Sequence, residues 1–262
     1  MSADKAPDPS EPIPAATLVI FRHAPQAGSP PEILMVVRSK EMVFAGGAAV
    51  FPGGRIDPED FALAATLAPD LEPDDAAARI AAIRETLEEA GLAVGLTGPI
   101  NGDSAAAARA MLLDQGALAP VLDRFGWQLD LQALTPFARW LPRGMPEGRI
   151  FDTRFYLADL GTGAVDVAVD DTENTHLFWT SAAAALNTAE RGDIRIIFPT
   201  ARNLERLAQF ASFEAARSHA DATPVQTITP WMEERDGKRY LHIREDAGYP
   251  VTCEDLTTAM RG

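Results

Sequence analysis

The first strongly apolar part of the chain consists of two short runs of branched and apolar residues, "ATLVIFR" at 16–22 and "EILMVVR" at 32–38. The intervening segment "HAPQAGSPP" is rich in Pro and Gly, which favour turns, so the pattern predicts a β-hairpin. Similar runs later in the chain predict further strands at 131–142, 151–160, 176–180 and 239–246.

Helical spacing of apolar residues alternates with these strands. The pattern predicts a helix at 59–68 and another at 73–90, which begins with Pro73 and ends before Gly91, where a left-handed cap is common. Further helices are expected at 104–115, 119–125, 181–190 and 199–219. Without an internal repeat or a long linker, we expect a disordered acidic, proline-rich tail at 1–14 and one α/β (α+β) domain at 15–262.

Composition narrows the class of protein. The 262 residues are 47% hydrophobic, enough for a substantial core, and carry a net charge of −15. This acidity argues against general nucleic-acid binding, which depends on Lys and Arg. A single cysteine, the absence of a long apolar run and an acidic start predict a cytoplasmic protein with no membrane segment.

Three glutamates crowd one turn of the helix predicted at 73–90. Glu85, Glu88 and Glu89 project together because residues at i, i+3 and i+4 share a helix face, whereas Leu87 points to another side. Like charges at this spacing repel. A divalent cation would offset the repulsion, and carboxylate oxygens favour Mg²⁺ or Mn²⁺. Arg84 is placed to hold one carboxylate.

A glycine pair stands about 30 residues before the glutamates. Gly53 and Gly54 allow backbone conformations closed to other residues, so a carbonyl can turn toward a metal and the chain can pass close to a ligand. Either feature alone has an ordinary explanation, a turn or a solvated helix face. Their combination is the informative signal.

Together these residues resemble the signature of the Nudix hydrolases, carried by Gly54, Asp60, Arg84, Glu85, Leu87, Glu88, Glu89, Gly91 and Leu92. Two departures stand out: the family usually has glutamate at the position of Asp60, and residues 61–83 form a long insertion inside the motif. With "VFPGGRID" before it and "LTPFARWLP" after it, the chain is similar to the branch that includes peroxisomal coenzyme A diphosphatases.

The resemblance implies a mixed β-sheet sandwiched between helices, with helical insertions at about 61–83 and 103–126 and a C-terminal helix plus short strands. It also implies hydrolysis of a diphosphate linkage by metal-activated water, with Mg²⁺ or Mn²⁺ as cofactor. Glu85, Glu88 and Glu89 would be metal ligands and catalytic residues, and the Gly53 carbonyl a further ligand. Asp60 and Arg84 would hold the metal ligands in position without binding the metal themselves.

The general base and the substrate contacts stay open. Glu173, six residues before Trp179, matches a loop position from which family members often draw a base; Glu89 is the rival, and His176 a weaker candidate. Forked guanidinium groups suit phosphate oxygens, and aromatic rings can stack a base. The residues we expect to bind substrate are Arg38, Arg55, Arg139, Phe44 and Trp140.

The expected partner is a small nucleoside diphosphate derivative, with coenzyme A or its acyl esters suggested by the branch alone. ADP-ribose, dinucleotides and nucleotide sugars present the same diphosphate. Two alternatives of another class are a Nudix-fold sensing module that has lost catalysis and an acidic interaction protein. Assembly is open, with a homodimer as the commonest form among oligomers.

Overall fold

The computed structural model describes residues 11–24, 26, 28–39, 45–143, 149–160 and 174–259, without the side chains of residues 174 and 175. Of the predicted disordered tail, residues 1–10 lie outside this part. The first strand, β1 (Ile13–Arg22), begins before the predicted start at residue 16, so it includes the last two residues assigned to the tail. Among the described residues, no helix is long and apolar enough to cross a membrane.

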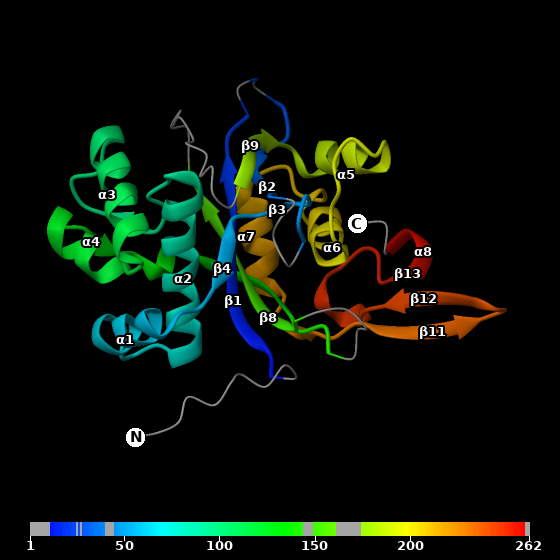
Figure 1. Ribbon diagram of the computed structural model, residues 1–262. Coiled ribbons are helices and arrows are strands. Elements are labelled where there is room, and N and C mark those ends of the chain that lie inside the picture. The colour runs from blue at the N-terminus through cyan, green and yellow to red at the C-terminus, as the bar shows by residue number, and fades with distance from the viewer. Residues whose placement is uncertain are drawn as a thin grey trace.

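Eight strands of the described residues form one mixed sheet (Figure 1). The order is β10-β7-β8-β1-β2-β3, with β4 on β1 and β9 on β2. The pairs β1–β8 and β7–β10 are parallel and the others antiparallel. The predicted hairpin is therefore confirmed, as is the mixed sheet. The remaining bounds are β2 (Glu32–Arg38), β3 (Ala49–Val50), β4 (Gly53–Arg55), β7 (Thr135–Trp140), β8 (Phe151–Asp159), β9 (Asn174–Thr180) and β10 (Thr227–Ile228).

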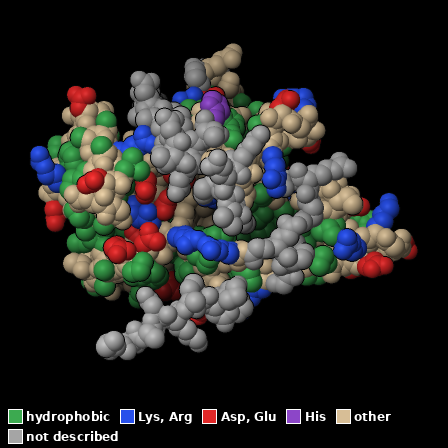
Figure 2. All heavy atoms as spheres, viewed as in Figure 1, with side chains coloured by type: hydrophobic (Ala, Val, Ile, Leu, Met, Phe, Trp, Pro, Cys, Tyr) green, Lys and Arg blue, Asp and Glu red, His purple; other side chains and the backbone are tan. Residues whose placement is uncertain are grey.

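Alternate residues of β1 serve two hydrophobic cores, as expected for a strand covered on both faces. Leu18 and Ile20 belong to the core shared with α2 (Pro73–Ala90). Val19 and Phe21 belong to the core shared with α6 (Phe198–Leu207) and α7 (Phe213–Ala222). The helices thus enclose the sheet as two outer layers, which confirms the predicted sandwich (Figure 1). On the face shown in Figure 2, acidic and basic side chains lie close together over the helical side of the molecule, formed by residues 58–125.

The predicted insertion at 61–83 is not a separate unit. It comprises most of α1 (Pro58–Leu67), the following turn and the first eleven residues of α2 (Pro73–Ala90), which runs unbroken into the glutamates. The two helices pack as a hairpin. The predicted insertion at 103–126 forms α3 (Gly102–Gln115) and α4 (Leu118–Phe125), beside a small ladder of β5 (Leu96–Thr97) and β6 (Gln128–Leu129).

The prediction of one long helix at 199–219 is wrong. The chain forms α6 (Phe198–Leu207) and α7 (Phe213–Ala222), after α5 (Ala182–Glu190). Ser212 caps α7 by accepting a hydrogen bond from the Ala215 amide at 3.2 Å, so a new helix starts where the apolar spacing alone suggests continuation.

The C-terminal region contains a three-stranded antiparallel sheet, where the apolar pattern alone predicts one strand at 239–246. It consists of β11 (Trp231–Arg235), β12 (Lys238–His242) and β13 (Cys253–Asp255), followed by α8 (Leu256–Ala259), and it projects from the side of the molecule (Figure 1). Two short 3₁₀ turns, Leu131–Ala133 and Glu245–Ala247, complete the described elements.

Candidate active site

Helix α2 places the glutamates. Its first turn is capped by Glu72, whose carboxylate accepts hydrogen bonds from the amides of Asp74 at 3.1 Å and Asp75 at 2.7 Å. It ends at Gly91, which adopts the left-handed conformation with φ 70°. Ile83 and other apolar residues of α2 are fully buried against the sheet. The helix is therefore fixed at both ends and along one face, and the glutamate-bearing turn has a set orientation.

Arg84 pairs with two of the glutamates. Its guanidinium lies 2.9 Å from the Glu85 carboxylate and 3.3 Å from the Glu88 carboxylate. The Arg84 side chain is only 5% exposed, against 13% for Glu85 and 27% for Glu88. A buried guanidinium with several donors holds both carboxylates in fixed positions.

The first helix of the insertion supplies the other side of Arg84. Asp60, which is 2% exposed, accepts from Arg84 at 3.0 Å, and Asp57 lies 3.1 Å away. The same Asp60 carboxylate accepts the Asp57 amide at 2.9 Å, and the Arg55 carbonyl accepts from Arg84 at 2.9 Å. Asp60 therefore reaches Arg84 across 24 residues, despite being shorter than the glutamate common in the family.

The glycine pair contacts the third and first glutamates. The Gly53 amide donates to Glu89 at 3.0 Å. Gly53 has φ 154°, and a Cβ there would lie 2.7 Å from the Thr17 Cα. A Cβ on Gly54 would lie 2.6 Å from a Glu85 carboxylate oxygen. Gly53 requires glycine because the backbone of β1 lies so close, whereas a side chain at Gly54 would displace the end of the Glu85 side chain.

Burial dominates the electrostatics of this cluster. It raises the pKa of Glu85 from 4.5 to about 8; Arg84 opposes the shift, and the charges of Glu89 and Glu88 add to it. Burial acts to lower the pKa of Arg84, but the carboxylates of Asp60, Glu85 and Asp57 outweigh it and hold that pKa above its ordinary range. A buried carboxyl that resists ionisation beside other carboxylates is a place where a bound cation is stabilising.

The carboxylates of Glu85, Glu88 and Glu89 share one side of α2 but do not converge on a single point. In the described part of the chain, only His23, Asp159 and Glu214 have potential metal-ligand atoms all within 4.8 Å of one another. The reason is that each glutamate already has a partner: Arg84 for two of them and the Gly53 amide for Glu89.

Two predicted substrate residues, Arg38 and Arg55, lie on different strands of the sheet. Strand β2 pairs with β1 only up to Ile33 and then with β3 at Val36 and Val37. The Arg38 amide donates to the Ala48 carbonyl at 3.0 Å, so Arg38 lies beside the start of β3. Within the described residues, the buried Nε of Arg38 has no hydrogen-bond partner. The Arg55 side chain is exposed on β4 while its carbonyl holds Arg84.

Other predicted site residues lie elsewhere. Arg139 forks onto Asp152 at 2.8 and 2.6 Å, near the N-terminal end of α2, so the structure does not bring it to the glutamates. Trp140 is 1% exposed and donates to the Tyr249 hydroxyl at 2.9 Å, which leaves no face for a ligand and corrects its assignment to substrate binding.

Phe44 and Glu173 lie outside the described residues. His176 is exposed on β9 and stacks on Phe178.

Sequence reasoning missed two contacts of the site. Asp57 is paired with Arg84, and the only signal was its position before Pro58, typical of a helix start. Arg109 of α3 donates to the Glu88 carbonyl at 2.8 Å. That contact stabilises the end of α2 from 21 residues away. No local sequence pattern predicts it.

Comparison with known proteins shows what the chain resembles, although no protein-family model matches it. It is 26% identical over 278 residues to the acyl-coenzyme A diphosphatase NUDT19 of Gallus gallus, covering 83% of this chain and 74% of that protein. The corresponding protein of Xenopus laevis is 24% identical over 261 residues, covering 77% and 66%. A crystal structure of a NUDIX hydrolase from Alicyclobacillus acidocaldarius is 30% identical, covers 80% of this chain and 96% of that one, and superimposes with a TM-score of 0.69.

Proposed function

The chain belongs to the Nudix hydrolase family, and on that premise we propose that it cleaves the diphosphate linkage of coenzyme A or an acyl-coenzyme A, dependent on Mg²⁺ or Mn²⁺. It is an enzyme of the pyrophosphohydrolase type. The nature of the substrate and the need for metal are the proposed parts. The cytoplasmic location stays a prediction.

One contact carries the proposal: the 3.0 Å hydrogen bond from the Gly53 amide to Glu89. It joins the two halves of the signature, 36 residues apart, and places the glycine turn directly against the glutamate helix. A Nudix-fold module without catalysis would be expected to lack the acidic residues, whereas this chain retains Glu85, Glu88 and Glu89.

The donor set fits a hard divalent cation. Glu85, Glu88 and Glu89 would hold it, with the Gly53 carbonyl as a further candidate, and carboxylate oxygens without thiol or imidazole favour Mg²⁺ or Mn²⁺. When bound, such an ion neutralises charge on the diphosphate and lowers the pKa of a coordinated water. Arg84 keeps Glu85 and Glu88 oriented, and Glu89, held by the Gly53 amide, is one candidate to accept the proton of the attacking water; Glu173 is the other.

Arg38 is the first candidate to bind a phosphate. Its Nε is buried without a partner among the described residues, and buried donors are normally satisfied. A phosphate oxygen would satisfy it with a charge-assisted hydrogen bond. Arg55 is the second candidate, on the strand that carries the glycine pair.

A panel of diphosphates tests the substrate. Full-length protein with Mg²⁺ or Mn²⁺ is incubated with coenzyme A, an acyl-coenzyme A, ADP-ribose, a dinucleotide and a nucleotide sugar, and products are identified by mass spectrometry. We expect hydrolysis of the diphosphate of the coenzyme A compounds, which gives adenosine 3′,5′-bisphosphate and 4′-phosphopantetheine or its acyl ester. Cleavage of ADP-ribose alone would show that the substrate is wrong while the diphosphate chemistry holds.

Matched variants test the metal ligands. Glu88→Gln and Glu89→Gln should lower kcat at least about 100-fold and reduce the calorimetric heat of Mn²⁺ binding, because each removes a charged ligand. Asp74→Asn, at the exposed other end of the same helix, is the control and should leave both unchanged. Normal Mn²⁺ binding by both glutamine variants would contradict the site.

A further inference from the structure

A second group of potential metal ligands lies at the other end of β1, and it does not depend on the proposed function. His23, Asp159 and Glu214 each offer one ligand atom, and these atoms all lie within 4.8 Å of one another. His23 follows β1 by one residue, whereas Gly53 pairs with Thr17. Six residues of strand separate Thr17 from His23, about 20 Å at 3.3 Å per residue.

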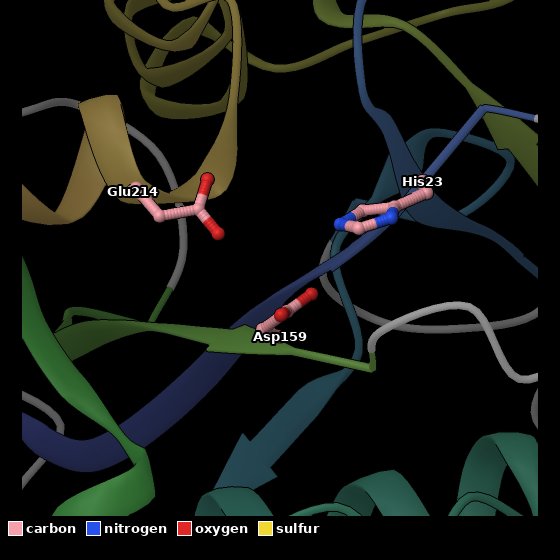
Figure 3. A group of neighbouring side chains, drawn as sticks. All are labelled: His23, Asp159 and Glu214. Carbon is pink, nitrogen blue, oxygen red and sulfur yellow. The ribbon is translucent and has the colours of Figure 1, made fainter. Parts of the chain in front are cut away.

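The sheet and α7 bring these three residues together. Parallel pairing of β1 with β8 sets Phe21 beside Asp159, two residues before His23. Phe213 packs edge-on against Phe21 with ring centroids 5.5 Å apart, which fixes the start of α7 on the sheet. Glu214, the next residue, then faces the strand ends, and all three side chains point toward a shared space (Figure 3).

A pocket of about 270 Å³ adjoins the group. Its walls include His23 and Asp159 themselves, together with Phe21, Ser212 and Phe213. Phe21 belongs to the core on the α6–α7 side of the sheet, so the pocket opens on the face opposite the glutamate helix. The volume is large enough for several water molecules or a small ligand beside an ion.

The donor set differs from that of the glutamate helix. It combines one imidazole nitrogen with two carboxylate oxygens, a mixture that suits Zn²⁺, Mn²⁺ and similar transition metals better than Mg²⁺. Ligand atoms about 2.1 Å from one ion stand at most about 4.2 Å apart, so the observed 4.8 Å limit requires only small side-chain rotations. The negative charge of Glu214 in the first turn of α7 also interacts favourably with the helix dipole. That interaction does not require His23 and Asp159 beside it.

We infer that His23, Asp159 and Glu214 form a second divalent-metal site, specific for a transition metal, whose open coordination positions face the 270 Å³ pocket. The ion would be held by three side chains from three separate elements, and water or a small anionic ligand would complete its coordination from the pocket. The site is separate from the glutamates in position, sheet face and donor chemistry.

Calorimetry with Zn²⁺ alone tests the site on the full chain. His23→Ala and Glu214→Gln should each weaken one class of Zn²⁺ sites at least tenfold. The unfolding temperature in a chelator should stay unchanged in His23→Ala, because that side chain is exposed. His176→Ala is the matched control, since it removes another exposed histidine. Equal weakening by His23→Ala and His176→Ala would reveal general imidazole binding and overturn the inference.

Crystals soaked in ZnCl₂ give an independent answer. We expect an anomalous peak between His23, Asp159 and Glu214, and its absence would refute the site. Hydrolysis with Mg²⁺ should stay within twofold of wild type in His23→Ala, while Glu88→Gln should keep the Zn²⁺ peak. Failure of the proposed hydrolase activity would therefore leave this test intact, and the reverse holds as well.

Discussion

The two ends of α2 carry the same kinds of residue in different surroundings. At the N-terminal end, Arg154 lies 3.6 Å from Glu72 and 3.9 Å from Asp74, whose side chains are 58% and 65% exposed. At the C-terminal end, Arg84 lies 2.9 Å from Glu85, with both side chains largely buried. Arg154 also lies 3.7 Å from Asp75, which is 22% exposed and is held by Arg79 at 2.7 Å. Water screens Glu72 and Asp74 but not Glu85, so the group around Arg84 depends more on every partner being present. Burial, rather than the presence of acidic residues, separates a site from a charged surface.

Replacing Arg84 should have the largest effect. Arg84→Met leaves Asp60 and Glu85 buried without their cation, so we expect a loss of about 3–5 kcal/mol in the free energy of unfolding, measured by urea denaturation. Arg84→Lys keeps the charge but not the fork and should recover part of it. A loss below about 1 kcal/mol would mean that the buried ion pairs of Arg84 contribute no more to stability than the exposed ones at the other end of α2.

A side chain at Gly53 should be the next most damaging change. In Gly53→Ala the Cβ would meet the backbone of β1 at Thr17, so we expect a loss of about 1–3 kcal/mol and a strong fall in activity. Gly102→Ala is the control because nothing lies within 4 Å of its Cβ. Equal stability of the two variants in thermal unfolding would contradict the close approach.

The raised pKa of Glu85 predicts a pH dependence of stability. The folded-state pKa of about 8 exceeds the ordinary 4.5, so the protonated carboxyl favours the folded state. This contribution is complete below pH 4.5 and is lost as pH rises through about 8. In EDTA, the free energy of unfolding should therefore fall between pH 6 and 8, by up to about 1.4 kcal/mol per pH unit. Glu85→Gln should flatten the slope, and an unchanged slope would contradict the assignment.

Changes at the exposed end of α2 should have the smallest effect. Arg154→Ala should cost less than about 1 kcal/mol, because Glu72 and Asp74 stay solvated. The third partner, Asp75, is 22% exposed but keeps its ion pair with Arg79 at 2.7 Å. The same variant should leave hydrolysis unchanged. A larger loss in urea denaturation would mean that this group acts as a buried network.

The sequence predicted the elements whose apolar pattern is strong and local. The hairpin of β1 and β2 and the whole of α2 follow from residue spacing. The division into α6 and α7 did not, because the capping hydrogen bond of Ser212 outweighs the apolar spacing. Strand β11 was missed because its residues are mostly exposed and show no alternation of buried positions.

The site was predictable in its residues but not in its contacts. Helical spacing placed Glu85, Glu88 and Glu89 on one side, yet their partners depend on chain segments that only the fold brings together, such as Gly53 on Glu89. Trp140 fits a stacking role by residue type, and only its burial shows that it packs in the core. A single sequence does not show which distant segments pack together, so these contacts could not be predicted from it.

The hairpin of α1 and α2 has a consequence for how the chain can vary in length. Asp60 and Arg84 meet near the open end of the hairpin, while the connection at 68–72 forms its far tip. Extra residues at the tip would extend the hairpin outward and leave the registration of Arg84 with the glutamates undisturbed. The insertion is therefore a natural attachment point for a new binding element or a fused domain, because the fold separates its length from its catalytic geometry.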